Sequence, residues 1–506
     1  MKDKNEISSE TYDRLYPTAA NPAKFYGQPK IHKPEPIPIR PIISSCGTAT
    51  YETAKELTKI IGPLVGKNSH HVKNTSDFIE FIKNIKLEPG EILISYDVSA
   101  LFTCVPVEKA IEIIEEKLKA DTTLSERTSL SIPSITQLLS FCLQNTCFTF
   151  QGQYYEQVYG ASMGSPISPI LANIYMEYFE NLALSSVPNP PRVWKRYVDD
   201  TFVIIKKDYE PDLFKHINSI DPNIKFTKEA AREDGSMPFL DTLVTPQADG
   251  ALHTSVYRKP THTDLYLRWD SHHSLGSKLS VVRTLYHRAH TVCSTPELLN
   301  SECNHIKTVL KRCGYPDWAI KKGHDQAKHI PSNKNPTSSK TKSKNKSKGY
   351  VTVPYVRGFS ESYKSLMKKY NMEVYFRGAN SIKKTLVKPK DKDDKMDKSG
   401  VIYRIKCNDC DADYVGEAGR IFRDRFKEHC KPKSPIYHHH QESGHALPTS
   451  DNVEILGRED HSLSRVIKES MFIRVNDPPL NRNIGKYLLP HIYDDILKSN
   501  CDLLFN

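Results

Sequence analysis

Two adjacent carboxylates, Asp199 and Asp200, lie in a stretch rich in apolar, β-branched and aromatic residues between Trp194 and Ile205. This composition predicts two strands joined by a tight turn that carries the acids at its tip. Carboxylate oxygens are suitable ligands for Mg²⁺, and one bound ion offsets the repulsion between neighbouring acids. The pair therefore indicates a divalent-metal site, although Asp-Asp is also common in surface turns that have no chemical role.

A third carboxylate, Asp97, follows the apolar run 92–96. A lone Asp at the end of a strand is usually a turn residue or a helix cap. Two-metal phosphoryl transfer, however, needs carboxylates from separate strands that converge on ions roughly 4 Å apart. The set resembles the palm of reverse transcriptases, in which Asp97 matches the metal ligand of the first motif and Asp199 with Asp200 matches the Tyr-x-Asp-Asp box.

The proline-rich segment 24–43 extends this resemblance. Its prolines forbid a long helix and predict extended segments and turns, which a solvated arm would also show. The string Tyr-Gly-x-Pro-Lys-x-His-Lys followed by Arg-Pro-Ile is similar to the fingers of Penelope-like retroelement polymerases. The resemblance implies that Lys33 and Arg40 bind the incoming triphosphate. It also implies that Phe102 crowds a ribose 2′-hydroxyl and so favours deoxynucleotides, although a core position explains this aromatic equally well.

The run from Gly160 to Pro166 predicts a flexible loop that enters a helix, with Ser165 as the N-cap and Pro166 in the first turn. Gly164 would let the backbone approach a ligand closely. A capped core helix is the simpler interpretation, and the resemblance adds that the loop lies beneath the nascent base pair and the template. Many reverse transcriptases carry Gln where this chain has Gly160 or Ala161.

A second group of chemically capable residues lies in the C-terminal part of the chain. Two short strand-like runs each carry a tyrosine, a basic helix carries an arginine and a histidine, and a glutamate and an asparagine follow. Hydrolysis of a phosphodiester needs a metal, a nucleophilic water and positive charge where negative charge builds up. In this order and spacing the fragments closely resemble a GIY-YIG nuclease. The residues are Tyr403, Tyr414, Arg425, His429, Glu469 and Asn481.

The nuclease resemblance implies a role for each of these residues. Glu469 would hold one divalent ion, Tyr403 would activate the water and Arg425 would neutralise the phosphate, while the other three support the site. Without the resemblance, Glu469 would be interpreted as a solvated helix residue and Arg425 as a surface ion-pair partner.

A Cys-x-x-Cys pair at positions 407 and 410 lies between the two tyrosines and has zinc-knuckle spacing. Alone, this spacing is ambiguous between zinc binding, redox chemistry and chance. Endonuclease-bearing Penelope-like elements resemble this chain here too, with two Cys inside the nuclease motif and two His after it, which implies a Zn²⁺ site. The predicted ligands are Cys407, Cys410, His439 and His445, with His438, His440 and Cys430 as rivals.

The chain has 506 residues, with 71 Lys and Arg against 60 Asp and Glu. This length is enough for about two to four domains, and the net charge of +11 has the sign expected for a nucleic-acid partner. Eleven Cys without a short repeating framework indicate a reducing compartment. No apolar run reaches the roughly 20 residues of a membrane span, and no signal peptide is recognisable. We therefore expect a soluble intracellular protein with no membrane partner.

Periodicity and composition divide the chain into parts. Apolar residues at helical spacing in segment 51–91 and after Pro106 predict amphipathic helices, and the lysine-rich, acid-free segment 331–349 predicts a disordered linker. The predicted parts are an N-terminal leader (1–23), fingers and palm (24–265), a thumb-like helical region (266–330), the basic linker (331–349), a small connector (350–398), the nuclease with its zinc knuckle (399–490) and a C-terminal tail (491–506).

These observations predict an α+β protein in which a reverse-transcriptase right hand precedes a small α/β GIY-YIG domain. The resemblance implies a nuclear Penelope-like retroelement protein that uses template RNA, target DNA and deoxynucleoside triphosphates. Mg²⁺ or Mn²⁺ would serve catalysis, and Zn²⁺ would fill the knuckle. The nuclease would nick target DNA, and the exposed 3′-hydroxyl would prime the copying of RNA into DNA.

Two alternatives remain open. One is a domesticated or truncated protein that binds nucleic acid without copying it; the start of the fingers string near residue 24 favours truncation, because the family usually carries a long segment before it. The other is a GIY-YIG repair nuclease without polymerase activity, whose upstream half presents DNA. Primer extension separates both from a polymerase.

Overall fold

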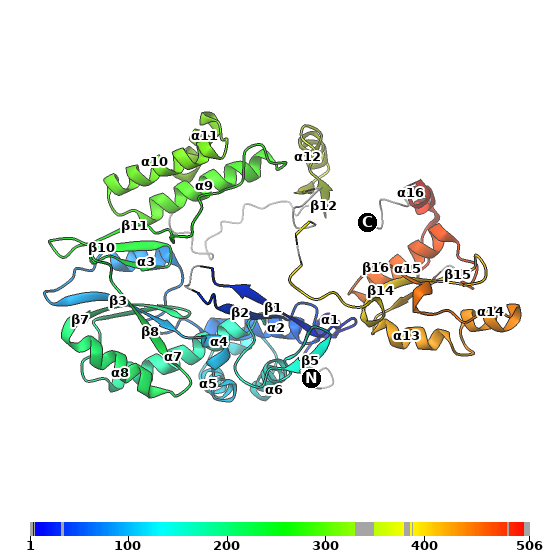
Figure 1. Cartoon of the computed structure of the whole chain (residues 1–506), viewed down its shortest axis with the longest axis horizontal. Helices are drawn as coiled ribbons and strands as arrows, with labels where there is room; N and C mark the ends of the chain where they lie inside the picture. The colour runs from blue at the N-terminus through cyan, green and yellow to red at the C-terminus, as the bar shows by residue number, and fades with distance from the viewer. Residues whose placement is uncertain are drawn as a thin grey trace.

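The computed structural model describes residues 4, 6–31, 35–328, 349–378, 385–386, 388–482 and 485–499. In Figure 1 the N-terminal half lies at the lower left, a helical bundle lies above it, and the C-terminal strands and helices lie at the right. Within the described ranges, none of the helices combines the length and the apolar character that a membrane crossing requires.

A four-stranded antiparallel sheet forms the centre of the N-terminal half, with the strand order β6-β7-β3-β8. Successive side chains of a strand point to opposite faces. On β7, Val203 and Ile205 therefore pack with helices α5 to α8, while Phe202 and Ile204 pack with α3 and strands β9 to β11. Both faces are covered, so the strands are held from two sides. The strands are β3 (Glu91–Val98), β6 (Val193–Tyr197), β7 (Asp200–Lys206) and β8 (Phe226–Ala230).

The elements that cover this sheet precede, separate and follow its four strands in the sequence. The helices of the larger core are α2 (Tyr51–Ile61), α4 (Leu101–Cys104), α5 (Val107–Lys119), α6 (Ile132–Gln144), α7 (Ser168–Ser186) and α8 (Glu210–Ile220). The opposite face carries α3 (Thr75–Ile82), β9 (Met237–Phe239), β10 (Thr242–Pro246) and β11 (Leu252–Val256). The amphipathic helix predicted after Pro106 is confirmed as α5. The helical segment predicted over 51–91 is confirmed in part, as α2 and α3, whereas residues 65–74 and 83–90 are not helical.

The proline-rich segment enters a second sheet, with the strand order β2-β1-β4-β5. Strand β1 (Ala23–Pro29) pairs antiparallel with β2 (Ile39–Ser44) and parallel with β4 (Cys147–Phe150), and β5 (Gln153–Glu156) completes the sheet. The extended conformation predicted for this segment is therefore confirmed as a strand pair.

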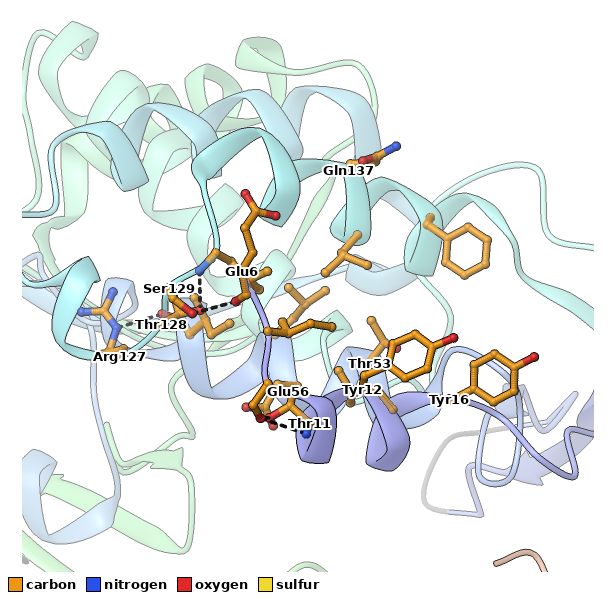
Figure 2. A pocket seen from close by; sticks show the side chains of 18 of the residues that line it. Glu6, Thr11, Tyr12, Tyr16, Thr53, Glu56, Arg127, Thr128, Ser129 and Gln137 are labelled. Carbon is orange, nitrogen blue, oxygen red and sulfur yellow. Dashed lines mark hydrogen bonds between the residues drawn. The ribbon is translucent and has the colours of Figure 1, made fainter. Parts of the chain in front are cut away.

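Helix α1 (Ser9–Leu15) lies beside α2 (Tyr51–Ile61), and these helices line a pocket together with α6 (Figure 2). Glu6 lines this pocket and is held by two hydrogen bonds: its main-chain oxygen accepts one from Ser129 Oγ at 2.7 Å, and its carboxylate accepts one from Ser134 Oγ at 2.7 Å. None of the described site residues predicted from the sequence lines this pocket, so it is separate from the predicted chemistry.

Three helices, α9 (Leu275–Val292), α10 (Pro296–Arg312) and α11 (Asp317–Lys328), share one hydrophobic core. The turn between α10 and α11 contains Gly314 with φ of +84°, a conformation that favours glycine. A small unit follows in which β12 (Gly349–Pro354) and β13 (Met372–Arg377) are parallel and α12 (Phe359–Lys369) connects them.

The C-terminal part is built on a three-stranded antiparallel sheet with the order β15-β14-β16. Side chains of β14 alternate between two cores: Tyr403 and Ile405 pack in one and Ile402 packs in the other. The elements are β14 (Val401–Lys406), β15 (Asp413–Ala418), α13 (Phe422–His429), α14 (Pro435–Ser443), β16 (Val453–Arg458), α15 (Ser462–Asn476) and α16 (Asp494–Ser499).

Residues just before β14 join the C-terminal part to the N-terminal segment that precedes β1. The hydroxyl of Ser399 lies 2.7 Å from Asn21 Oδ1 and 3.2 Å from the main-chain oxygen of Ala19. Thr18 Oγ1 donates a hydrogen bond to the main-chain oxygen of Asp460 at 2.8 Å. The two halves of the chain are therefore in direct contact through polar groups.

Candidate active sites

Strands β6 and β7 form a hairpin whose turn carries the Asp pair, which confirms the predicted local structure. Asp200 pairs directly with Asp97 of β3. Val198 in the turn has φ of +60°, and the main-chain oxygen of Asp199 accepts a hydrogen bond from the main-chain nitrogen of Val98 at 2.9 Å. Directly opposed residues of a sheet have Cβ atoms about 4.5–5.5 Å apart. The structure thus brings the three predicted carboxylates to one end of the sheet.

Burial and like charge act together on Asp200. The pKa of Asp200 is raised to about 6, mainly by burial; the charges of Asp97, Asp199 and Glu229 also raise it, and the hydrogen bond that Ser95 Oγ donates at 3.0 Å lowers it. A divalent cation would reverse the effect of the neighbouring acids. A cluster in which one carboxylate resists ionisation therefore fits Mg²⁺ or Mn²⁺.

Arg196, which the sequence analysis did not single out, anchors this hairpin. Its fully buried guanidinium donates to the carboxylate of Glu180 on α7, with Nε 2.7 Å from Oε1 and Nη2 3.2 Å from Oε2. Its Nη1 donates to Asn173 Oδ1 at 2.9 Å and to the main-chain oxygen of Val198 at 3.0 Å. Trp194 Nε1 also donates to Glu180, at 2.9 Å. Arg196 therefore connects the Asp-Asp turn to α7. A basic residue inside an apolar strand was the signal in the sequence that could have revealed this role, because charged residues are almost never buried without a partner.

We expect Glu180→Gln to lower the free energy of unfolding by about 3–5 kcal/mol, because the buried guanidinium of Arg196 would lose its anion. Urea denaturation followed by circular dichroism measures this change. The matched control is Glu80→Gln, which breaks an exposed ion pair with Lys83 and should change stability by about 1 kcal/mol or less. Equal effects of the two substitutions would contradict the anchoring role.

The two predicted tyrosines of the second site lie on adjacent antiparallel strands. Tyr403 on β14 pairs with Gly416 on β15, two residues after Tyr414. A Cβ atom at position 416 would lie 2.6 Å from the hydroxyl oxygen of Tyr403 and 2.8 Å from Cε1 of Tyr414. Only glycine therefore leaves room for both rings, which explains the Tyr-Val-Gly sequence physically.

The hydroxyl of Tyr403 is the centre of a buried polar cluster. It lies 2.7 Å from His429 Nε2, and Arg425 Nε donates to it at 3.2 Å. His429 Nδ1 lies 3.1 Å from Ser434 Oγ. Burial and the charge of Arg425 lower the pKa of His429 to about 3, so this imidazole is neutral at physiological pH. Burial raises the pKa of Tyr403 well above its ordinary value, so its hydroxyl is protonated.

Glu469 on α15 has a buried carboxylate. Its Oε2 is buried and has no hydrogen-bond partner among the described residues. The pKa of Glu469 is raised to about 7, mainly by burial; the charge of Glu417 also raises it, and the cations of Lys486 and Arg425 lower it. Glu417, which the sequence analysis missed, is paired with Arg465 Nε and Lys486 Nζ, each at 2.8 Å. The orphaned carboxylate oxygen of Glu469 fits a divalent cation.

The remaining predicted residues of this site pack around the two strands. The ring of Tyr414 lies 4.9 Å from the ring of His429, measured between centroids. The side-chain amide of Asn481 binds the main chain of Val415 on β15. Its Nδ2 donates to the main-chain oxygen of Val415 at 2.8 Å, and its Oδ1 accepts a hydrogen bond from the main-chain nitrogen of Val415 at 2.9 Å. This contact holds the strand of Tyr414 in place, which is a positioning role.

The four residues predicted as zinc ligands lie together, with ligand atoms all within 4.8 Å of one another. Cys407 Sγ is 3.5 Å from His445 Nδ1, Cys410 Sγ is 3.4 Å from His439 Nε2, and the two imidazole nitrogens are 3.2 Å apart. Tetrahedral zinc, with bonds of about 2.3 Å to sulfur and 2.0 Å to nitrogen, separates such atoms by roughly 3.5 Å. The donor set and its spacing therefore fit Zn²⁺.

Tertiary packing separates His439 from its rivals. His439 and His440 both lie on the face of α14 that carries the buried Ile436, because they follow it by three and four residues. The ring of His440 is turned to the main-chain oxygen of His445, which Nδ1 contacts. None of His438, His440 and Cys430 belongs to the cluster found in the described residues. Helical spacing therefore could not choose between His439 and His440 from the sequence.

Comparison with known proteins bears on the first site. Residues 31–230 match the family described as reverse transcriptase (RNA-dependent DNA polymerase), and this range contains Asp97, Asp199 and Asp200. The chain contains a reverse transcriptase domain. Residues 265–325 match the animal helix-turn-helix domain, which covers α9, α10 and most of α11. No curated protein matches the sequence.

Several solved polymerase structures resemble the chain distantly. Apo telomerase from Candida tropicalis is 14% identical with a TM-score of 0.38, over 62% of this chain and 58% of that one. Telomerase from Candida albicans, in complex with a fragment of telomeric RNA, is 10% identical with a TM-score of 0.39, over 64% and 63%. The Sicinivirus RNA-dependent RNA polymerase is 12% identical with a TM-score of 0.37, over 63% and 71%. The chain spans less than two thirds of either telomerase.

Other predicted substrate residues of the reverse transcriptase domain occupy several elements. Arg40 is exposed on β2, opposite Gln28. Lys33 lies outside the described residues. Phe102 on α4 packs partly buried against the large core, and its main-chain oxygen accepts a hydrogen bond from the nitrogen of Ala161 at 2.7 Å. Phe102 thus contributes to the core and also supports the loop before α7, while its predicted contact with the ribose remains a prediction.

The prediction that Ser165 caps the helix with Pro166 in its first turn is wrong. Helix α7 begins at Ser168, and Pro169 occupies its first turn. Residues 163–167 instead form turns against β2, where Ser45 Oγ donates to the main-chain oxygen of Gly164 at 2.7 Å. A Cβ atom at Gly164 would lie 2.0 Å from the main-chain oxygen of Ile43. The loop backbone therefore needs this glycine in order to pack on β2.

Proposed function

We propose that the chain is the protein of a Penelope-like retroelement, in which the reverse transcriptase domain copies RNA into DNA from a 3′-hydroxyl that a C-terminal GIY-YIG endonuclease exposes. The observation that carries the nuclease half is the cluster around Tyr403, with Arg425 and His429 in contact with its hydroxyl and the orphaned carboxylate of Glu469. The target DNA makes the nucleus the expected place of action.

In the polymerase site, Asp97, Asp199 and Asp200 would hold Mg²⁺ or Mn²⁺, which lowers the pKa of a primer hydroxyl and stabilises the leaving pyrophosphate. The chain itself contributes the register of β3 and β7, which brings Asp97 and Asp200 opposite each other. Arg196 holds the turn that presents Asp199. We assign binding of the deoxynucleoside triphosphate to Lys33 and Arg40.

In the nuclease site, the neutral imidazole of His429 can accept a hydrogen bond from the Tyr403 hydroxyl at Nε2 and so fix the direction of that hydroxyl. The oxygen of Tyr403 can then accept a hydrogen bond from the attacking water and orient it, which makes His429 a positioning residue. Arg425 supplies the positive charge that a developing phosphorane needs. Glu469 would hold a divalent ion that polarises the phosphate.

A coupled assay tests this function. The intact protein is incubated with Mg²⁺, deoxynucleoside triphosphates, an RNA template and a supercoiled plasmid. We expect nicked plasmid with labelled nucleotides attached to the 3′ end at the nick. Nicking without extension would favour a repair nuclease, and extension of a supplied primer without nicking would remove the nuclease from the proposal.

We propose that zinc bound by Cys407, Cys410, His439 and His445 stabilises the nuclease part. The expected result is that Cys407→Ser lowers the zinc content measured by mass spectrometry by about one ion per chain and lowers the melting temperature, because structural zinc contributes folding free energy. Cys430→Ser is the matched control and should keep the zinc. Unchanged zinc content in Cys407→Ser would contradict the site.

A further inference from the structure

We propose that the open face of the β12–β13 sheet binds single-stranded nucleic acid. This site lies outside the polymerase and nuclease sites and does not depend on either catalytic activity. Its class of ligand is an unpaired RNA or DNA strand, which presents flat bases and a phosphate at each nucleotide.

The two faces of this small sheet differ. Val374 is buried, and Phe376 and Val353 are half-buried on the face toward α12. The opposite face is exposed and carries Tyr350 and Tyr375, with 73% and 53% of their surfaces accessible. A two-stranded sheet has only marginal stability on its own in water. Here α12 covers one face, and the opposite face is exposed and therefore available for a ligand.

The two tyrosines form a pair on the exposed face. Tyr375 lies opposite Thr352, and Tyr350 lies opposite Glu373, so the rings are diagonal neighbours. Their centroids are 5.9 Å apart with an interplanar angle of 76°. The hydroxyl of Tyr375 donates to Glu373 Oε2 at 2.5 Å, which holds this side chain in place. Exposed aromatic rings on a sheet are suitable platforms for stacking of successive bases.

Charge on this unit favours a polyanion. Arg377 follows Tyr375 by two residues and is therefore exposed on the same face. Residues 349–377 contain five Lys and Arg against two Asp and Glu, and the preceding residues 331–348 contain six Lys and no acid. Glu373 is the one acid on this face, and Tyr375 already binds it.

The unit is attached to the helical bundle of the polymerase half. His272, just before α9, lies with Nε2 2.7 Å from the main-chain oxygen of Tyr355, and the two rings are 5.3 Å apart. Figure 1 shows α12 and β12 between this bundle and the C-terminal domain. A single strand that passes from one half of the protein to the other would therefore reach this face.

Photocrosslinking of the full-length protein locates the site. The probes are two 12-nucleotide oligomers, one of RNA with 5-iodouridine and one of DNA with 5-iododeoxyuridine, and an unlabelled hairpin duplex with a 3′ end occupies the polymerase site. We expect mass spectrometry to find crosslinked peptides from β12 and β13. The arm with the higher yield identifies the strand as RNA or DNA. Crosslinks confined to other parts of the chain would overturn the proposal.

Variants measured by fluorescence anisotropy under the same conditions test the mechanism. Tyr350→Ala and Tyr375→Ala should each weaken binding by at least about fivefold. The matched Tyr→Phe variants keep the ring and should stay within about twofold, as should Tyr370→Ala, which removes an exposed tyrosine at the end of α12. Arg377→Gln should reduce the slope of log affinity against log salt by about 0.7.

Two results would overturn the assignment even in well-folded variants. One is unchanged affinity in the double variant Tyr350→Ala/Tyr375→Ala. The other is a change in its oligomeric state by sedimentation velocity, because a second copy of the chain would then be the occupant of this face.

Discussion

We expect Asp199→Asn to reduce primer extension on an RNA template with Mg²⁺ by roughly a thousandfold, since a bound metal contributes several kcal/mol to transition-state stabilisation and each 1.4 kcal/mol is a factor of ten. The substitution removes one charged ligand oxygen but keeps the shape of the side chain. Asp199 is exposed, and its contact with Val98 uses the main-chain oxygen. The fold and the nicking activity should therefore survive.

The matched control for this measurement is Asp208→Asn. Asp208 is an exposed acid that follows β7 at the end opposite to Asp200, roughly 20 Å from the carboxylate cluster along the strand. This variant should extend primers like the intact protein. Extension retained in Asp199→Asn would refute the metal-ligand assignment, and extension lost in both variants would point to a general loss of folding.

We expect the inverse pattern for Glu469→Gln, with nicking of supercoiled DNA reduced by about a hundredfold or more and extension of a supplied primer unchanged. The amide cannot replace an anionic ligand of a divalent ion. Folding should tolerate it, because burial already raises the pKa of Glu469 to about 7, so the neutral form costs little at neutral pH. The melting temperature should accordingly change little.

Glu454→Gln is the control for the nuclease measurement. Glu454 lies on β16 of the same sheet, about half exposed, and its side chain is 3.6 Å from Arg404 in a loose ion pair. Its replacement should leave nicking unchanged. Equal nicking by Glu469→Gln and the intact protein would remove Glu469 from the site, while loss of nicking in both variants would indicate that the sheet has lost its structure.

A strong constraint connects the fold to the second site through Gly416. The hydroxyl of Tyr403 lies against Gly416. A Cβ atom at position 416 would be only 2.6 Å from the hydroxyl oxygen, which leaves no room for a side chain. The same strand carries Tyr414, and the amide of Asn481 binds its edge. The chemistry of Tyr403 therefore depends on backbone packing as much as on the polar residues around it.

Local pattern in the sequence was sufficient for the elements that bear the chemistry. Runs of apolar, β-branched and aromatic residues around Asp97 and around the Asp199–Asp200 pair predicted the strands and the turn, because strand propensity and turn residues act over a few positions. The same holds for the strands of Tyr403 and Tyr414 and for the Cys-x-x-Cys pair.

Tertiary structure alone decided the contacts between distant segments. The buried pair of Arg196 and Glu180, the ion-paired Glu417 beside Glu469 and the start of α7 at Ser168 all depend on which elements pack together. A charged side chain looks the same in sequence whether it is solvated or buried, because its partner can lie at any separation along the chain. The sequence by itself therefore determined which residues could do chemistry, and only the packing of strands against helices decided which partners hold them in position.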